Sequence, residues 1–160
     1  MSNQNIPGLL LTGIIATLIA GTLDALAAIY ILAAGQAKMV FQYIAAGAIG
    51  REAAFLGGNR SILIGVVFHY LITAIFTLFF FILYQREALL RRNAGVVAFI
   101  YGTLMWVVMN FLVLPVSKLK LDINKFTFKG TITGIAILII CVALPIVLAR
   151  YWYENKRKAA

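Results

Sequence analysis

The chain has 160 residues, of which 63% are hydrophobic and only 12% are charged, and its mean hydropathy is +0.98. Soluble globular domains carry about 25% charged residues, so this composition excludes an ordinary water-soluble protein. We therefore expect an integral membrane protein, with a formal net charge of +9 that has to be accommodated outside the hydrocarbon.

Four apolar stretches are long enough to cross a bilayer, because about 20 helical residues span about 30 Å of hydrocarbon at about 1.5 Å per residue. They cover residues 9–34, 61–84, 94–116 and 130–150. The leader before the first stretch contains no Lys or Arg, which favours a retained helix over a cleaved signal peptide. The sequence predicts one all-α transmembrane domain over residues 1–160.

The segment at residues 39–56 is also apolar, but it contains Arg51 and Glu52. Each of these charges would cost roughly 2.5 to 3.5 kcal/mol at the centre of a bilayer. We therefore expect an interfacial or re-entrant helix between the first and second spans. Gly57 and Gly58 then predict a helix stop and a turn before the second span.

Four spans place both termini and the second loop on one side of the membrane. That side carries seven Lys and Arg residues, and the first and third loops together also carry seven, so the positive-inside rule returns a tie. The amino group adds to the terminal side, so we expect cytoplasmic termini. The basic residues lie in loops and at span ends, which indicates contact with lipid headgroups rather than with nucleic acid.

Small and polar residues recur every fourth position on the spans, and this pattern marks the faces that pack against other helices. The first span has Ala16, Ala20, Asp24 and Ala28; the second has Gly65, His69, Thr73 and Thr77; the third has Ala98, Gly102, Trp106 and Asn110; the fourth begins with the motif GTITG, residues 130–134. Asp24 and His69, the only histidine, should therefore face other helices rather than lipid.

Asp24, His69 and Asn110 are predicted to lie in one layer. Counted from the span ends on one side of the membrane, they lie roughly 15, 12 and 9 Å deep. The segment that carries Arg51 must cover the same side. Because buried charges need partners, we expect Asp24 to pair with His69 or Arg51, with Asn110 as a bridge. Such a cluster is either a ligand or proton-relay site or a structural pin that fixes helix register.

No residue pattern indicates catalysis or a bound cofactor. A zinc site needs three or four ligands, and the chain offers one histidine and one cysteine, Cys141, in the last span. The chain also lacks the motifs of a nucleophile elbow, a P-loop or a dinucleotide-binding turn. We therefore expect no catalytic residue, no metal and no cofactor, and we do not expect an enzyme.

Four blocks carry a resemblance to a known group of proteins: AGTLDALAAIY, FQYIAAGAIGREAAFLGG, FHYLITAIFTLFFFILY and YGTLMWVVMNFLVLPVS, in that order. Together they resemble small bacterial inner-membrane proteins that are distantly similar to the YagU type. The resemblance implies a four-helix protein of the bacterial inner membrane, with Asp24, Arg51, His69 and Asn110 in the recurring blocks. It implies no substrate.

Two functions are consistent with these patterns. In the first, the chain is a small transporter, channel or ligand-binding membrane protein that uses the polar cluster, and it self-associates because four short helices enclose little volume. In the second, it is a non-catalytic accessory or scaffold subunit that binds another membrane protein through its Gly/Ala faces. The GTITG motif is the main reason for the second hypothesis.

Overall fold

The structure, a computed structural model, describes residues 6–119 and 127–159. The described part of the chain is helical, without strands, and four of its helices are long and apolar enough to cross a membrane: Ile6–Leu32, Gly58–Arg86, Ala94–Val116 and Phe128–Ala159. The prediction of an all-α protein with four spans and an additional helix between the first two is confirmed. Asp122 and two of the lysines of the predicted third loop, Lys120 and Lys125, lie outside the described residues.

The spans are made of regular helices and short π-helical segments. The first consists of α1 (Ile6–Ala27) and η1 (Ala28–Leu32), and the second is α4 (Gly58–Arg86). The short 3-10 turn η2 (Ala88–Arg91) leads to the third span, which consists of α5 (Ala94–Val108), η3 (Met109–Val113) and α6 (Leu114–Val116). The fourth span consists of α7 (Phe128–Ile137), η5 (Leu138–Ala143) and α8 (Leu144–Ala159). The last helix thus continues well beyond the predicted end at Arg150.

Two of the π-helical segments lie just before a proline. Proline has no N–H to donate to the carbonyl four residues earlier, and its ring clashes with that carbonyl. Pro115 follows η3 and Pro145 follows η5, so the wider turn lies where the regular α-helical bond is lost. Both spans remain continuous through these wider turns.

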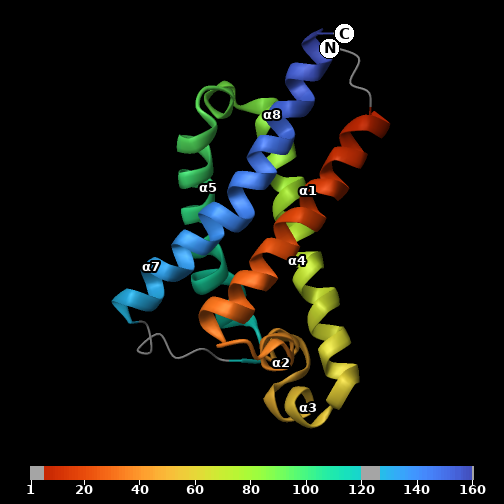
Figure 1. The fold of residues 1–160 in the computed structure, drawn as a ribbon, viewed down its shortest axis with the longest axis vertical. Helices are drawn as coiled ribbons and strands as arrows, with labels where there is room; N and C mark the ends of the chain where they lie inside the picture. Colours follow the sequence, from red (N-terminus) through yellow and green to blue (C-terminus); the bar gives the residue numbers. More distant parts are fainter. Residues whose placement is uncertain (1–5, 120–126, 160) are drawn as a thin grey trace.

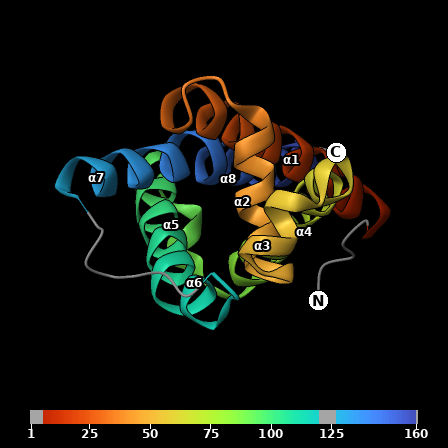
Figure 2. The ribbon, with the colours of Figure 1, turned by 90° about the horizontal axis from the view of Figure 1, so that it is seen from below.

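The segment between the first two spans forms two short helices, α2 (Ala37–Ile49) and α3 (Arg51–Leu56), which lie across one end of the bundle (Figures 1 and 2). Gly50 separates them with a φ of +90°, a conformation that glycine adopts easily. The buried amide of Gln42 donates to the carbonyl oxygens of Ala54 at 3.1 Å and Phe55 at 3.4 Å. This amide holds α3 against α2. The start of α1 and the end of α8 lie at the opposite end of the bundle (Figure 1).

Small residues allow the helices to approach one another closely, as expected where lipid gives no hydrophobic drive for association. Gly65 on α4 touches the backbone of Phe41 on α2, and a methyl group on Gly102 of α5 would lie 2.7 Å from the Cα of Ile139 on η5. Ala16 and Ala20 of α1 are almost completely buried. The inward face predicted for the second span is confirmed, since Gly65, His69, Thr73 and Thr77 are all buried. On the predicted face of the first span, Ala16 and Ala20 are buried, and Asp24 and Ala28 are half-buried.

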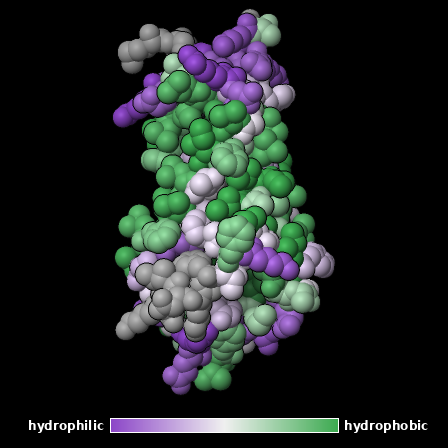
Figure 3. All heavy atoms as spheres, turned by 90° about the vertical axis from the view of Figure 1, so that its left-hand side faces the viewer, coloured by the Kyte–Doolittle hydropathy of each residue, from purple (hydrophilic) through white to green (hydrophobic). Residues whose placement is uncertain are grey.

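The outer surface is apolar over the middle of the molecule and hydrophilic at both ends. Figure 3 shows this on the face formed by the left-hand side of Figure 1, where hydrophobic side chains form a broad band between two hydrophilic ends. Large apolar side chains such as Leu10, Leu63 and Phe99 are more than half exposed. A surface of this kind suits contact with lipid, as the composition predicted.

Candidate functional site

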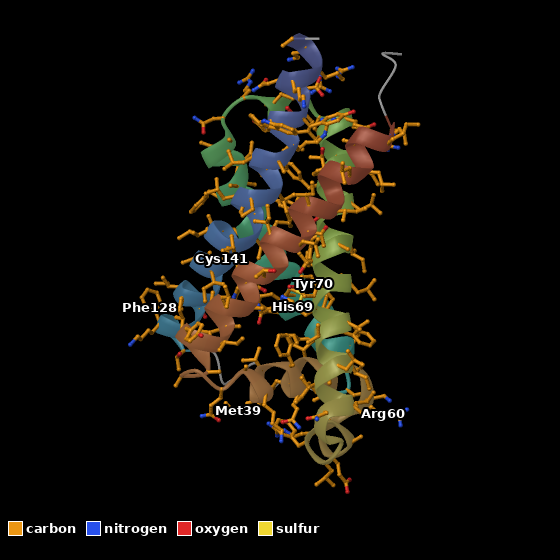
Figure 4. The ribbon with its side chains drawn as sticks, turned by 45° about the vertical axis from the view of Figure 1, so that its right-hand side comes forward. Met39, Arg60, His69, Tyr70, Phe128 and Cys141 are labelled. Atoms are coloured by element: carbon orange, nitrogen blue, oxygen red, sulfur yellow. The ribbon has the colours of Figure 1, made fainter. Side chains whose placement is uncertain are left out.

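Asp24 and His69 come together where α1 packs on α4, and Figure 4 shows His69 at the level where the two helices meet. The imidazole Nδ1 lies 4.0 Å from Oδ2 of Asp24, and the opposite ring nitrogen, Nε2, lies 2.7 Å from the carbonyl oxygen of Gly21. Of the two partners predicted for Asp24, His69 or Arg51, the structure places His69 beside it.

The bond to Gly21 fixes which nitrogen of His69 carries a proton. A carbonyl oxygen only accepts, so Nε2 must be the donor. Nδ1 then faces the Asp24 carboxyl group either as a bare acceptor or as a second N–H. The two side chains therefore form a site for one shared proton, as an imidazolium beside a carboxylate or a neutral imidazole beside a carboxylic acid.

The contact between α1 and α4 is close on both sides of this pair. The Tyr70 hydroxyl lies 2.8 Å from the hydroxyl oxygen of Thr22 and forms a hydrogen bond with it. The Tyr70 ring fills the space beside Gly21, where a Cβ atom would lie 2.7 Å from the ring. His69 is thus positioned by its neighbours on both helices, and its Nε2 bond contributes to holding the bundle together.

Asp24 is less completely satisfied than His69. The 4.0 Å separation exceeds the length of a direct hydrogen bond, and no hydrogen bond joins Asp24 to any other described residue. Its side chain keeps 22% of its surface exposed, although the first span continues for eight more residues, or about 12 Å, to Leu32. A carboxyl group at this depth is costly without a partner, and Asp24 is one of the residues that line a pocket.

That pocket, called here the central pocket, has a volume of about 600 Å³. It lies between α4, which packs on α1 and α2, and α5, which packs on η5 and α8. The described residues that line it include Asp24 from α1; Tyr43, Ile44, Gly47 and Ala48 from α2; His69, Thr73 and Phe76 from α4; Met105 and Met109 from the third span; and Leu138 and Val142 from η5. Its walls are mostly apolar, with the Asp24–His69 pair among a few polar groups.

Tyr101 bonds to the backbone of Phe76, one of the residues that line the central pocket. Its hydroxyl donates to the carbonyl oxygen of Phe76 at 2.7 Å, and its ring lies 5.0 Å from the ring of Phe80. These contacts join α5 to α4 on the side of the termini. At the other end, the Lys118 N–H donates to the carbonyl of Gly47 at 2.8 Å, which ties the end of the third span to α2.

The other two predicted site residues lie apart from the pair. Asn110 does not form the predicted bridge: its amide donates to the carbonyl of Trp106, one turn earlier in its own helix, at 2.8 Å. Arg51 does not reach Asp24 either. Its guanidinium is exposed, donates to the Tyr43 hydroxyl at 2.7 Å and lies 5.6 Å from the centre of that ring. Of the four residues predicted to form one site, only Asp24 and His69 lie together, and Asn110 and Arg51 each bond elsewhere.

The sequence reading missed the residues of the third span that line the central pocket. Met105, Met109 and Val113 share one helix face at four-residue spacing and lie beside the face that was predicted to point inward. Met and Val side chains at this spacing are equally typical of helix packing and of lipid contact, so the pattern alone does not indicate a pocket. Tyr43 was also missed, although it lies on the same short segment as Arg51.

A second charged cluster lies near the terminal end of the bundle. Arg150 is only 1% exposed, its Nη1 lies 3.1 Å from Oε2 of Glu154, and its guanidinium lies 4.5 Å from the centre of the Tyr84 ring. Arg157 binds the other carboxylate oxygen at 2.6 Å. Arg150 was expected to extend toward headgroups as a span-end cation, but the rings of Tyr84 and Tyr153 bury it in the bundle.

The chain was compared with protein-family models, with curated proteins and with solved structures. No family model, no curated protein and no solved structure matches it. The function of the chain is therefore inferred from its own structure, that of a multi-pass helical membrane protein with an acid–imidazole pair beside an apolar pocket.

Proposed function

We propose that this protein binds a small, mostly apolar molecule in the central pocket and uses the Asp24–His69 pair to hold the polar end of that molecule. The observation that carries the proposal is the position of the pair in the wall of a pocket of about 600 Å³. Pockets that bind small molecules are commonly of this size, apolar, and supplied with a few polar groups. Transport of the bound molecule across the membrane is the activity that best fits such a site in a multi-pass protein.

A purely structural role explains only part of the pair. Nε2 of His69 satisfies the Gly21 carbonyl, as a structural pin would. Asp24, however, lines the pocket with a partly exposed side chain, and it makes no hydrogen bond with another described residue. If the pair served only to hold the helices in register, a carboxyl group without a hydrogen-bond partner inside the membrane would lower the stability of the protein. This cost favours a role for Asp24 in binding.

The test uses an alkanol that carries a photoreactive diazirine on its chain, added to the protein in lipid nanodiscs. We expect labelled peptides from α2, α4 and η3, mapped by mass spectrometry, and competition by the unlabelled alkanol. Ala48→Phe places a ring in the central pocket and should abolish this labelling. The control is Ala53→Phe, which makes the same substitution at an exposed position of α3.

Labelling that is equal in both Phe variants, or that maps only to the lipid-facing surface, would contradict binding in the pocket. Asp24→Asn and His69→Gln are the further variants. If both fold and retain wild-type labelling and any transport measured with the ligand, the pair has no part in binding.

The accessory-subunit hypothesis is less well supported. Its motive was the GTITG motif at residues 130–134, but a Cβ on Gly134 would lie 3.1 Å from the Trp106 indole nitrogen. That small residue therefore serves the packing of the chain on itself. Gly130, at the start of α7, is exposed and remains open to a partner or a second copy of the chain.

We further propose that the protein lies in the bacterial inner membrane with cytoplasmic termini, and that it is related to the YagU type. The resemblance of four sequence blocks supports the compartment and the relationship. The Lys and Arg counts of the two sides are equal, so the amino group on the terminal side is what favours this orientation. A reporter fused after residue 160 should be active in the cytoplasm, and activity only outside it would reverse the orientation.

A further inference from the structure

The charge of the central pocket indicates which class of ligand it takes. No lysine or arginine is among the described residues that line it, whereas one acidic residue, Asp24, is among them and its side chain is partly exposed. Arg51, on the segment next to α2, is directed to the Tyr43 hydroxyl and is not part of the lining. An anionic headgroup would therefore meet the Asp24 carboxylate with no lysine or arginine among the described wall residues, and the His69 imidazolium would already be paired with that carboxylate.

We propose that the central pocket takes an organic cation with an apolar body, and that its positive charge exchanges with the proton held on His69 beside Asp24. This inference rests on the proposed function and adds the ligand class to it. The apolar body would lie against Met105, Met109 and Val142, and the cationic group would lie beside the Asp24 carboxylate.

The exchange follows from the geometry of the pair. With His69 protonated on both nitrogens, the imidazolium neutralises Asp24 at 4.0 Å. A second positive charge beside the same carboxylate would be repelled strongly in a medium of low dielectric constant. Arrival of the cation therefore favours loss of the Nδ1 proton to solvent, while Nε2 keeps its proton and its bond to Gly21. One positive charge enters, one leaves, and the charge of the site is unchanged.

Other titratable groups near the pair do not supply a competing positive charge. Cys141 on η5 is close enough to Asp24 to interact with its charge, and the Tyr70 ring lies 5.4 Å from the ring of His69. Tyr43 lines the pocket from α2. A thiol and phenols are neutral when protonated, so the imidazole is the only one of these groups that can balance the Asp24 carboxylate as a cation.

The experiment compares three photoreactive probes that share one diazirine alkyl chain and differ only in their head: a quaternary ammonium, a hydroxyl or a sulfonate. In nanodiscs, we expect the ammonium probe to label the central pocket at least tenfold more efficiently than the sulfonate probe. Its labelling should rise with pH, because the competing imidazolium is lost as pH rises, and the quaternary head itself does not titrate.

Two conservative variants separate the contributions of the pair. Asp24→Asn should remove the preference for the ammonium probe. His69→Gln keeps a donor for the Gly21 carbonyl and should keep the preference while removing the pH dependence. A thermal unfolding curve for each variant distinguishes altered binding from loss of the fold.

The outcomes separate the two proposals. The cation inference is wrong, and the binding function stands, if the hydroxyl probe labels the pocket but the ammonium probe labels it no more efficiently than the sulfonate probe. The same conclusion follows if the ammonium probe labels Asp24→Asn with the same preference over the sulfonate probe as in the wild type. If no probe labels the pocket in the folded wild-type protein, both proposals fail. An ammonium preference with no pH dependence in the wild type overturns the exchange with the His69 proton.

Discussion

Gly65 on α4 lies directly against the backbone of Phe41 on α2, with no space for a side chain between the two helices. A Cβ atom at residue 65 would overlap the Phe41 carbonyl group, whose carbon would be only 2.6 Å away. This contact holds α2 across the end of the bundle, where it contributes one wall of the central pocket.

Gly65→Ala should therefore destabilise the protein although alanine favours helices. Overpacking of a filled interface costs about 1 to 3 kcal/mol, because backbone atoms must move apart. The matched control is Gly13→Ala on α1, where the new methyl group would make an ordinary contact with the Phe81 ring at 3.6 Å. We expect the control to be neutral or stabilising by up to about 1 kcal/mol. Equal unfolding free energies for the two variants in mixed micelles would contradict the close contact.

The ring of His69 should be protonated at Nε2 under all conditions in which the protein is folded. Its bond to the Gly21 carbonyl, with a separation of 2.7 Å, requires a donor on that nitrogen. Nitrogen-15 NMR of the single histidine reports the protonation of each ring nitrogen. A neutral His69 with the proton on Nδ1 alone would contradict the arrangement, and His69→Gln should preserve the fold better than His69→Leu.

Tyr101→Phe removes the hydroxyl that joins α5 to α4 without changing the ring. The lost bond to the Phe76 carbonyl is 2.7 Å long and partly buried, so we expect a loss of about 1 to 2 kcal/mol of unfolding free energy. Tyr30→Phe is the control, since the Tyr30 side chain is 71% exposed. The same measurement in mixed micelles compares them, and an effect of similar size in both variants would show that the Tyr101 bond contributes nothing specific.

Arg150→Met should destabilise the terminal end of the bundle by about 3 kcal/mol, because it leaves the Glu154 carboxylate with only the partly exposed Arg157. Removing Glu154 as well should recover part of this loss, since the double variant Arg150→Met/Glu154→Leu leaves no carboxylate to be compensated. A double-mutant cycle on unfolding free energies measures the coupling. Additive losses would mean that Arg150 acts through its stacking on Tyr84 alone.

The sequence determined the spans, their order and much of their inward faces. Lipid offers no partner to backbone or polar groups, so apolar runs of sufficient length must become helices, and polar residues on them must turn toward other helices. This argument correctly placed His69 and Thr73 in the interior of the bundle. It also gave His69 as one of the two predicted partners of Asp24, and the structure places the two side chains together. It did not require knowledge of any distance between helices.

Only the tertiary structure decided how the remaining polar groups are satisfied and where the open space lies. Asn110 finds an acceptor in its own helix, and Arg51 finds one in Tyr43, so neither needs the pair. Arg150 is buried because aromatic rings from a distant helix surround it. The central pocket arises because α4 and α5 pack on different partners, and such a space depends on how whole helices pack rather than on a local pattern of residues.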